Sequence, residues 1–276
     1  MAQLQEFIGH ERDLGVLGWA IRQFALQLGA STVGALHVTC SDEAESECVE
    51  AFQRWFVAGT LPDLKDNRRA PMRTANIAGR YEWGSVVLLD EHFSTPGSRQ
   101  TLKLLVVKIN SHVAVRQLPE GPDYGWSERY GIETPCCGGL EALLAGSPLP
   151  PIRELAATFS HDGRNRVGLL LDMGRVPLGY RAVYAAAVNA QLQAQRAVAD
   201  IRGRRPRSPT IFLVLPAVTI NRPGPDGEML LGEFGIDWTE SRPVIRYRGL
   251  GDDPSRYHLR HDGGHAVLSD DHWTPR

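Results

Sequence analysis

Apolar residues along the chain fall into two patterns. The run TVGALHVTC, residues 32–40, is continuous and rich in branched side chains, which is typical of a buried strand. After it, Val49, Phe52 and Phe56 recur at helical spacing and predict a helix over residues 43–58. A strand is therefore expected to lead directly into a helix.

The same alternation continues through the first half of the chain. Helices are expected over residues 11–28 and, from the sequence CGGLEALLAG, over residues 137–146. The apolar runs GSVVLLDEHF, residues 84–93, and TLKLLVVKINSHVAV, residues 101–115, predict two more strands. Strands that alternate with helices favour an α/β fold with a mainly parallel sheet flanked by helices.

A proline-rich stretch divides the chain near its middle. The sequence AGSPLPPIREL, residues 145–155, places three prolines after a glycine and a serine, which is typical of a linker or turn. We therefore expect a first half over residues 1–145. A second α/β half, residues 146–276, is expected to complete the sheet or an interface.

The second half repeats the order of elements in the first. Residues 165–203 are predicted to form a strand, a turn and a long alanine-rich helix, and residues 208–234 a strand, a turn and a further strand. When residues 212–220 are aligned with residues 106–115, Ala217 falls opposite His112. The pattern predicts a degenerate internal repeat whose second copy has lost polar residues.

Composition narrows the class of protein. A net charge of −2 argues against a general nucleic-acid binder, and the basic cluster IRGRRPRSP, residues 201–209, is interpreted as a solvated helix end and loop. No membrane span is expected, because no apolar run reaches about 18 residues. Four cysteines in 276 residues are too few for a disulfide framework, and the first thirty residues lack a signal-peptide pattern. We expect free thiols and a cytoplasmic location.

Cysteines and a histidine fall where ligand sites form, beyond the carboxyl ends of strands in an open α/β sheet. Cys40 and Asp42 follow one predicted strand, and His112 lies inside or just past another. Cys136 and Cys137 lie at a glycine-rich helix start, where the helix dipole favours a thiolate. Two thiolates and an imidazole are an ordinary ligand set for catalytic zinc. Cysteines also serve as small buried hydrophobes, so a metal-independent binding protein stays open.

Two motifs resemble those of a known family. CSDE, residues 40–43, resembles the first metal motif of β-type carbonic anhydrases, a cysteine followed two residues later by an aspartate. KLLVVKINSHVAV, residues 103–115, with YGIETPCCGGLEALL, residues 130–144, resembles more closely the limiting-CO2-inducible B/C branch of those enzymes. That branch has a strand ending in a histidine, a polar loop, and a Cys-Gly motif that opens a helix. The resemblance covers residues 30–145 and implies a β-carbonic-anhydrase-like fold.

The resemblance implies that Cys40, His112 and Cys137 bind Zn2+. Asp42 would take the fourth position or hydrogen-bond the metal-bound water. Cys137 is preferred to Cys136 because it directly precedes a glycine, as the cysteine of the family does. The activity implied is the reversible hydration of CO2 to bicarbonate, with CO2 and bicarbonate as the small-molecule substrates and a homodimer as the assembly.

His92, in the sequence DEHFSTPG, is a candidate proton shuttle or pocket-lining residue for that reaction. A loop histidine with no role in the reaction is the alternative interpretation.

One departure from the family pattern affects the aspartate. Ordinary β-type enzymes carry an arginine two residues after it, where this chain has Ala44. Without that arginine, Asp42 could bind the metal and close the site. Arg80, Arg116 and Arg129 are candidate replacements from elsewhere in the chain. An inactive zinc-binding regulatory or structural protein of the same fold, which senses bicarbonate or serves as a partner subunit, is therefore the alternative function.

The end of the chain is rich in histidine. Residues 257–273 hold four histidines and three aspartates, enough ligands for a second metal site. A glycine pair and the terminal position favour a mobile tail instead.

Overall fold

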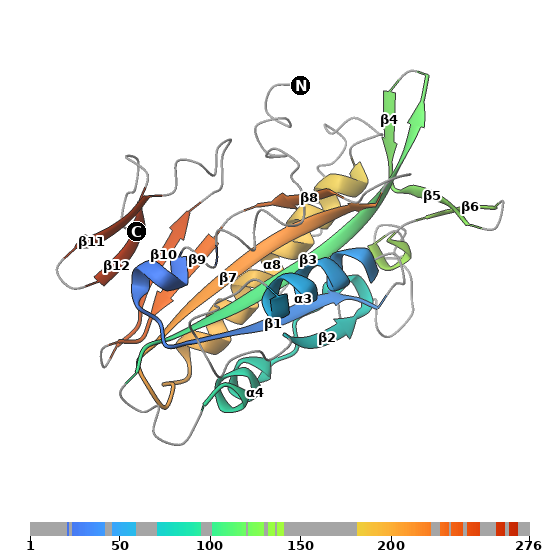
Figure 1. Cartoon of the computed structure of the whole chain (residues 1–276). Coiled ribbons are helices and arrows are strands. Elements are labelled where there is room, and N and C mark those ends of the chain that lie inside the picture. The colour runs from blue at the N-terminus through green and yellow to red at the C-terminus, as the bar shows by residue number, and fades with distance from the viewer. Residues whose placement is uncertain are drawn as a thin grey trace, which may run out of the picture.

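An eight-stranded sheet forms the centre of the protein (Figure 1). The computed structural model describes residues 21, 24–41, 46–58, 71–94, 101–119, 121–129, 132–135, 137–140, 181–221, 227–231, 233–239, 242–248, 258–262 and 265–269. The main path of the sheet runs through six strands, in the order β10 (Val244–Arg248), β9 (Glu233–Asp237), β7 (Thr210–Asn221), β3 (Lys103–Leu118), β1 (Thr32–Cys40) and β2 (Met72–Asn76). Off this path, β4 (Gly121–Tyr124) pairs with β3 and β8 (Gly227–Leu230) pairs with β7.

The four strands β7, β3, β1 and β2 run parallel, and the remaining pairings are antiparallel. All nine residues of β1 are buried, as are all residues of β7 except the last. Strands covered on both faces appear in sequence as continuous apolar runs. The α/β fold with a mainly parallel sheet is therefore confirmed, and so are the predicted strands at β1, β3 and β7.

The sheet continues across the predicted boundary at residue 145, because β3 and β7 pair in parallel from Lys103 and Thr210 to Ala114 and Asn221. Their register places His112 beside Thr219. The predicted repeat, the linker at residues 145–155 and the division into two halves remain predictions, and residues 141–180 lie outside the described part of the chain.

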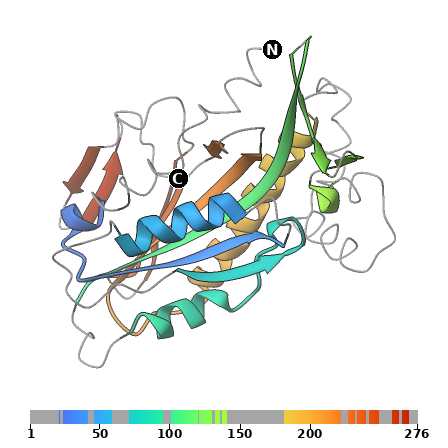
Figure 2. The ribbon, with the colours of Figure 1, turned by 45° about the vertical axis from the view of Figure 1, so that its right-hand side comes forward.

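Helices cover both faces of the sheet (Figure 2). Helix α3 (Ser46–Ala58) lies on one face, and the long helix α8 (Arg181–Arg202) lies on the other. The buried side of α8 is rich in alanine, and such small side chains let the helix lie close to the sheet. The predicted helix at residues 43–58 is confirmed from Ser46 onward, and residues 24–28 of the predicted helix at 11–28 are helical.

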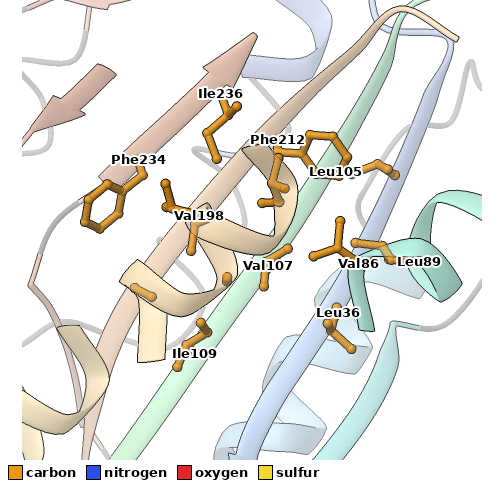
Figure 3. Close-up of a cluster of buried hydrophobic side chains, with 14 of the residues drawn as sticks. Leu36, Val86, Leu89, Leu105, Val107, Ile109, Val198, Phe212, Phe234 and Ile236 are labelled. Atoms are coloured by element: carbon orange, nitrogen blue, oxygen red, sulfur yellow. The ribbon is translucent and has the colours of Figure 1, made fainter. Parts of the chain in front are cut away.

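Among the described residues, the largest core cluster lies between the sheet, α8 and helix α4 (Ser85–His92) (Figure 3). It joins Leu36 of β1 and Val107 of β3 to Val198 of α8, and Phe234 and Ile236 of β9 extend it. The two halves of the sequence thus share one core as well as one sheet.

The prediction of a strand at residues 84–93 is wrong, because most of this segment forms α4. Val86, Leu89 and Phe93 are buried, whereas Leu88 is 58% exposed. That pattern has helical spacing, and the helix starts after Gly84, which has the left-handed φ of 92°. A run of four apolar residues fits both a short strand and a two-turn helix, and here packing against α8 and the sheet favours the helix.

Two small hairpins complete the described chain. Strands β5 (Trp126–Arg129) and β6 (Ile132–Pro135) form one, and β11 (His258–Asp262) and β12 (His265–Ser269) form the other. The predicted histidine-rich tail therefore contains a hairpin, although its side chains, and with them the second metal site, lie outside the described residues. In the part of the chain described, no helix has the length and apolar character needed to cross a membrane.

Candidate metal centre

Three distant segments meet where β1 ends. Cys40 is the last residue of β1, His112 lies within β3, and Cys137 directly precedes the helical residues 138–140. Their potential ligand atoms lie within 4.8 Å of one another, and the two sulfur atoms are 3.6 Å apart. All three side chains are buried, His112 completely. The structure thus brings together the three residues that the sequence singled out, in a cluster able to hold a metal ion.

The sheet itself creates this meeting point. Pairing between β1 and β3 ends at Val38 and Ile109, so His112 lies on the part of β3 that extends beyond the last residue paired with β1. The chain after β2 folds back over the same place as a short 3-10 helix, η2 (Ile77–Gly79). A Cβ atom on Gly79 would lie 1.9 Å from the carbonyl oxygen of Asn110, and its φ is +69°. Glycine is therefore required where this turn crosses β3.

The turn at η2 also supports the segment that bears Cys137. A Cβ atom on Gly139 would lie 2.6 Å from Cγ2 of Ile77, so the start of this helix packs against the turn. Ala78 is fully buried with φ 56°, a left-handed conformation that alanine rarely adopts. The surrounding side chains must hold it there.

Asn189 of α8 holds the turn in place. Its Nδ2 donates to the carbonyl oxygen of Ala78 at 2.5 Å and to Oγ of Ser111 at 2.7 Å. Ser111 Oγ also donates to the Ala78 carbonyl at 3.4 Å. Since Ser111 precedes His112, one amide on α8 links the turn to the strand that carries the imidazole.

The His112 ring is oriented by a residue of β7. Its Nδ1 lies 2.9 Å from Oδ1 of Asn221. A carbonyl oxygen only accepts hydrogen bonds, so Nδ1 carries the proton and donates, and Nε2 carries the lone pair. Metal-binding histidines take this form, with one nitrogen on the metal and the other donating to an acceptor.

The two thiols affect each other's ionisation. The hydrogen bond with Cys40 and then burial raise the pKa of Cys137 well above its usual value, while the neighbouring His112 ring acts in the opposite direction. Two neighbouring buried sulfurs do not both ionise readily without a cation. A divalent ion would neutralise two thiolates, so the donor set and its charge fit a bound metal.

His92 does not join this cluster. It is exposed at the end of α4, and its ring lies 4.9 Å from the ring of Phe93. Phe93 covers Gly34, where a Cβ atom would lie 2.4 Å from its ring. Gly34 precedes Cys40 by six residues, which is about 20 Å along a strand. His92 thus lies outside the cluster, and its role as a proton shuttle or pocket-lining residue remains a prediction.

The other residues singled out from the sequence are only partly described. Asp42, Ala44 and Cys136 lie outside the described residues, as does the side chain of Arg129. Arg116 forms an ion pair with Glu133.

Arg80, the remaining candidate arginine, lies near Arg196. Burial and then the charge of Arg80 lower the pKa of Arg196. A contact between Arg80 and Asp42 remains a prediction.

Sequence reasoning missed Asn221 and Asn189, which support the cluster. Each is an amide in an otherwise apolar setting, since Asn221 ends a buried strand and Asn189 lies on the alanine-rich face of α8. An amide on a buried face needs hydrogen-bond partners, and that is the signal by which both could have been found.

Comparison with known proteins finds solved structures of similar fold. No protein-family model and no curated protein matches the sequence. Among solved structures, PtLCIB4, a homolog of the limiting CO2-inducible protein LCIB, is similar with a TM-score of 0.60 and 15% identity, over 88% of this chain and 98% of that chain. LCIB itself is similar with a TM-score of 0.52 and 10% identity, over 86% of this chain and 93% of that chain.

The chain has the fold of the limiting CO2-inducible proteins. The resemblance stated from sequence covered residues 30–145, which was too short. A likeness over 88% of the chain includes much of the second half. The LCIB-like fold thus accounts for strands on both sides of the predicted boundary, including β3 and β7.

Proposed function

We propose that the protein is a zinc enzyme that hydrates CO2 reversibly to bicarbonate. The observation that carries the proposal is the buried cluster of Cys40, His112 and Cys137, at the carboxyl end of β1 in an LCIB-like fold. Two thiolates and one neutral imidazole leave one position of a tetrahedral ion open. The chemistry that zinc supplies in such a site is a water molecule whose pKa is lowered to about 7.

Each residue of the cluster has a defined role in this proposal. Cys40 and Cys137 bind as thiolates, and their burial keeps competing water away from the sulfur atoms. His112 binds through Nε2, because its Nδ1 proton is donated to Asn221. Asp42, two residues after Cys40, takes the fourth position or accepts a hydrogen bond from the bound water. His92, which lies outside the cluster, remains a proposed proton shuttle or pocket-lining residue.

A second function is favoured by one sequence observation. Ala44 stands where ordinary β-type enzymes carry the arginine that holds the aspartate off the metal. If Asp42 closes the site, the protein is an inactive zinc-binding regulatory or structural protein, which senses bicarbonate or serves as a partner subunit. In either case we propose that the protein is a homodimer in the cytoplasm. Light scattering of the purified protein, which measures the molar mass of the assembly, tests the homodimer.

The deciding experiment measures zinc per chain on protein purified without chelator, together with CO2 hydration by stopped flow on the same sample. About one zinc with hydration supports the enzyme. Zinc without hydration supports the closed site, and Asp42→Asn then tests whether removing the carboxylate charge restores hydration. Absence of zinc overturns both functions.

The ligand set is tested with a matched pair of cysteine variants. Cys40→Ser should lose bound zinc, whereas Cys48→Ser, which changes a buried cysteine outside the cluster, should keep it. Full zinc content in Cys40→Ser would show that the proposed ligand set is wrong.

A further inference from the structure

The contact between His112 and Asn221 joins the candidate ligand to the second half of the chain. His112 is fully buried on β3, and Asn221 is the last residue of the neighbouring strand β7. The twelve-residue pairing of these strands fixes their relative position and places His112 Nδ1 2.9 Å from Asn221 Oδ1. The contact is therefore set by the sheet rather than by a loop.

The hydrogen bond decides which imidazole nitrogen can bind a cation. A neutral imidazole has one protonated nitrogen and one lone pair. With an oxygen acceptor at Nδ1, the lone pair is on Nε2. If a donor faced Nδ1 instead, Nε2 would carry the proton and could not bind a metal.

We infer that Asn221 is a positioning residue of the metal centre: it fixes the Nδ1–H tautomer and the orientation of the His112 ring. This inference rests on the metal site within the proposed function and assigns that site a residue from the second half. The amide performs this task without adding charge. Two thiolates already neutralise a divalent ion, so a neutral acceptor adds no further charge beside the ligands, whereas a carboxylate would add another negative charge.

The test compares three variants of the full-length protein. Asn221→Leu removes the acceptor at similar volume, and Asn221→Asp keeps an oxygen acceptor. Gln191→Leu is the matched control, because Gln191 is another partly buried amide, whose Nε2 donates to the carbonyl of Leu231 instead. For each protein, nitrogen-15 NMR of the histidine rings reports the tautomer, competition with a chromophoric chelator gives the zinc affinity, and the visible spectrum of the cobalt-substituted protein reports ligand geometry.

The unaltered protein and Gln191→Leu should show the His112 proton on Nδ1 and equal zinc affinity. Asn221→Leu should lose that tautomer signal, change the cobalt spectrum and bind zinc about 10-fold to 100-fold more weakly. Asn221→Asp should keep the tautomer and bind zinc at least as tightly as the unaltered protein.

Two results would overturn the inference. One is a His112 proton on Nε2 in the unaltered protein, and the other is an Asn221→Leu variant with unchanged tautomer and zinc affinity. If Asn221→Leu does not fold, Asn221→Ser gives the same test, since its shorter side chain does not reach Nδ1.

The readouts also separate this inference from the proposed function. Tautomer and zinc affinity are measured without CO2, so a protein that binds zinc but hydrates nothing leaves the role of Asn221 intact. Conversely, active protein whose His112 tautomer and zinc affinity are both unaffected by Asn221→Leu would remove the role of Asn221 and leave the enzyme in place.

Discussion

Lys108 Nζ donates to Cys48 Sγ at 3.4 Å, and both side chains are buried, on β3 and α3 respectively. The Nδ2 of Asn110 donates to the same sulfur at 3.4 Å. The ammonium of Lys108 also lies 4.9 Å from the centre of the Phe52 ring. A buried ammonium needs such partners to offset its lost hydration. This contact therefore attaches the first turn of α3 to the strand that carries His112.

We predict that the Lys108 and Cys48 side chains contribute jointly to stability. In a double-mutant cycle of Lys108→Met and Cys48→Ala, urea unfolding should give a coupling free energy of about 1.5 to 3 kcal/mol, the range for a hydrogen bond to a charged group. Additive effects of the two substitutions would show that the contact adds nothing to stability.

We predict that His37 makes the fold sensitive to acid. Burial, then the charge of Lys108 and more weakly that of Arg73, hold the pKa of His37 well below 6.5, against the opposing effect of its hydrogen bond with Asn110. The unfolded chain thus binds a proton below about pH 6.5 that the folded protein does not, so stability falls as the pH drops through this range.

Between pH 6.5 and 5, His37 should contribute a slope of at most about 1.4 kcal/mol per pH unit to the free energy of unfolding. We expect His37→Gln to flatten this slope in urea titrations at several pH values, and His92→Gln, which changes an exposed histidine, to leave it unchanged. A slope unaffected by His37→Gln would assign the acid sensitivity to other groups.

Gly79 is predicted to be irreplaceable. Backbone strain alone costs about 1 to 3 kcal/mol. Gly79→Ala should lower the free energy of unfolding by more than this, because the new methyl group clashes with the Asn110 carbonyl oxygen, and it should also weaken zinc binding. Gly84→Ala is the control, since Gly84 also has a positive φ, of +92°, but open space at its Cβ. Equal losses in thermal and urea unfolding for the two variants would contradict the steric argument.

Asn189 should couple α8 to the metal centre. Asn189→Ala leaves the buried Ala78 carbonyl without its shorter hydrogen bond, at about 1 to 3 kcal/mol, and loosens the turn that packs against Gly139. Zinc affinity should fall together with stability. Gln191→Ala, two residues further along the helix, should change stability only slightly and zinc affinity not at all. Unaltered zinc binding in Asn189→Ala would limit Asn189 to a role in folding.

The sequence predicted those elements whose burial leaves a clear pattern. β1 and β7 are covered on both faces and so appear as unbroken apolar runs. β2, with the sequence MRTAN, lies at the edge of the sheet with alternating exposure and carries no such run. The apolar run of α4 was misassigned because it is short enough to suit either type of element.

The candidate site divides in the same way. Cys40, His112 and Cys137 could be singled out because their side chains carry recognisable chemistry near predicted strand ends and a helix start. Asn221 could be recognised only as a buried amide that needs a partner. That this partner is His112 depends on the register between β3 and β7, and pairing between distant strands is not encoded in local spacing. The candidate ligand residues were therefore easier to predict than the contacts that orient them.

The pairing of β3 with β7 determines how the chain can be cut into fragments. In a fragment of residues 1–145, β3 would lose its neighbour β7 and expose unpaired backbone N–H and C=O groups along a long apolar strand. His112 would also lose its contact with Asn221. A fragment of residues 146–276 would expose the matching edge of β7. Each fragment alone should therefore aggregate. When the two fragments are produced together, they should associate through the pairing of β3 with β7, as the parts of a split protein do.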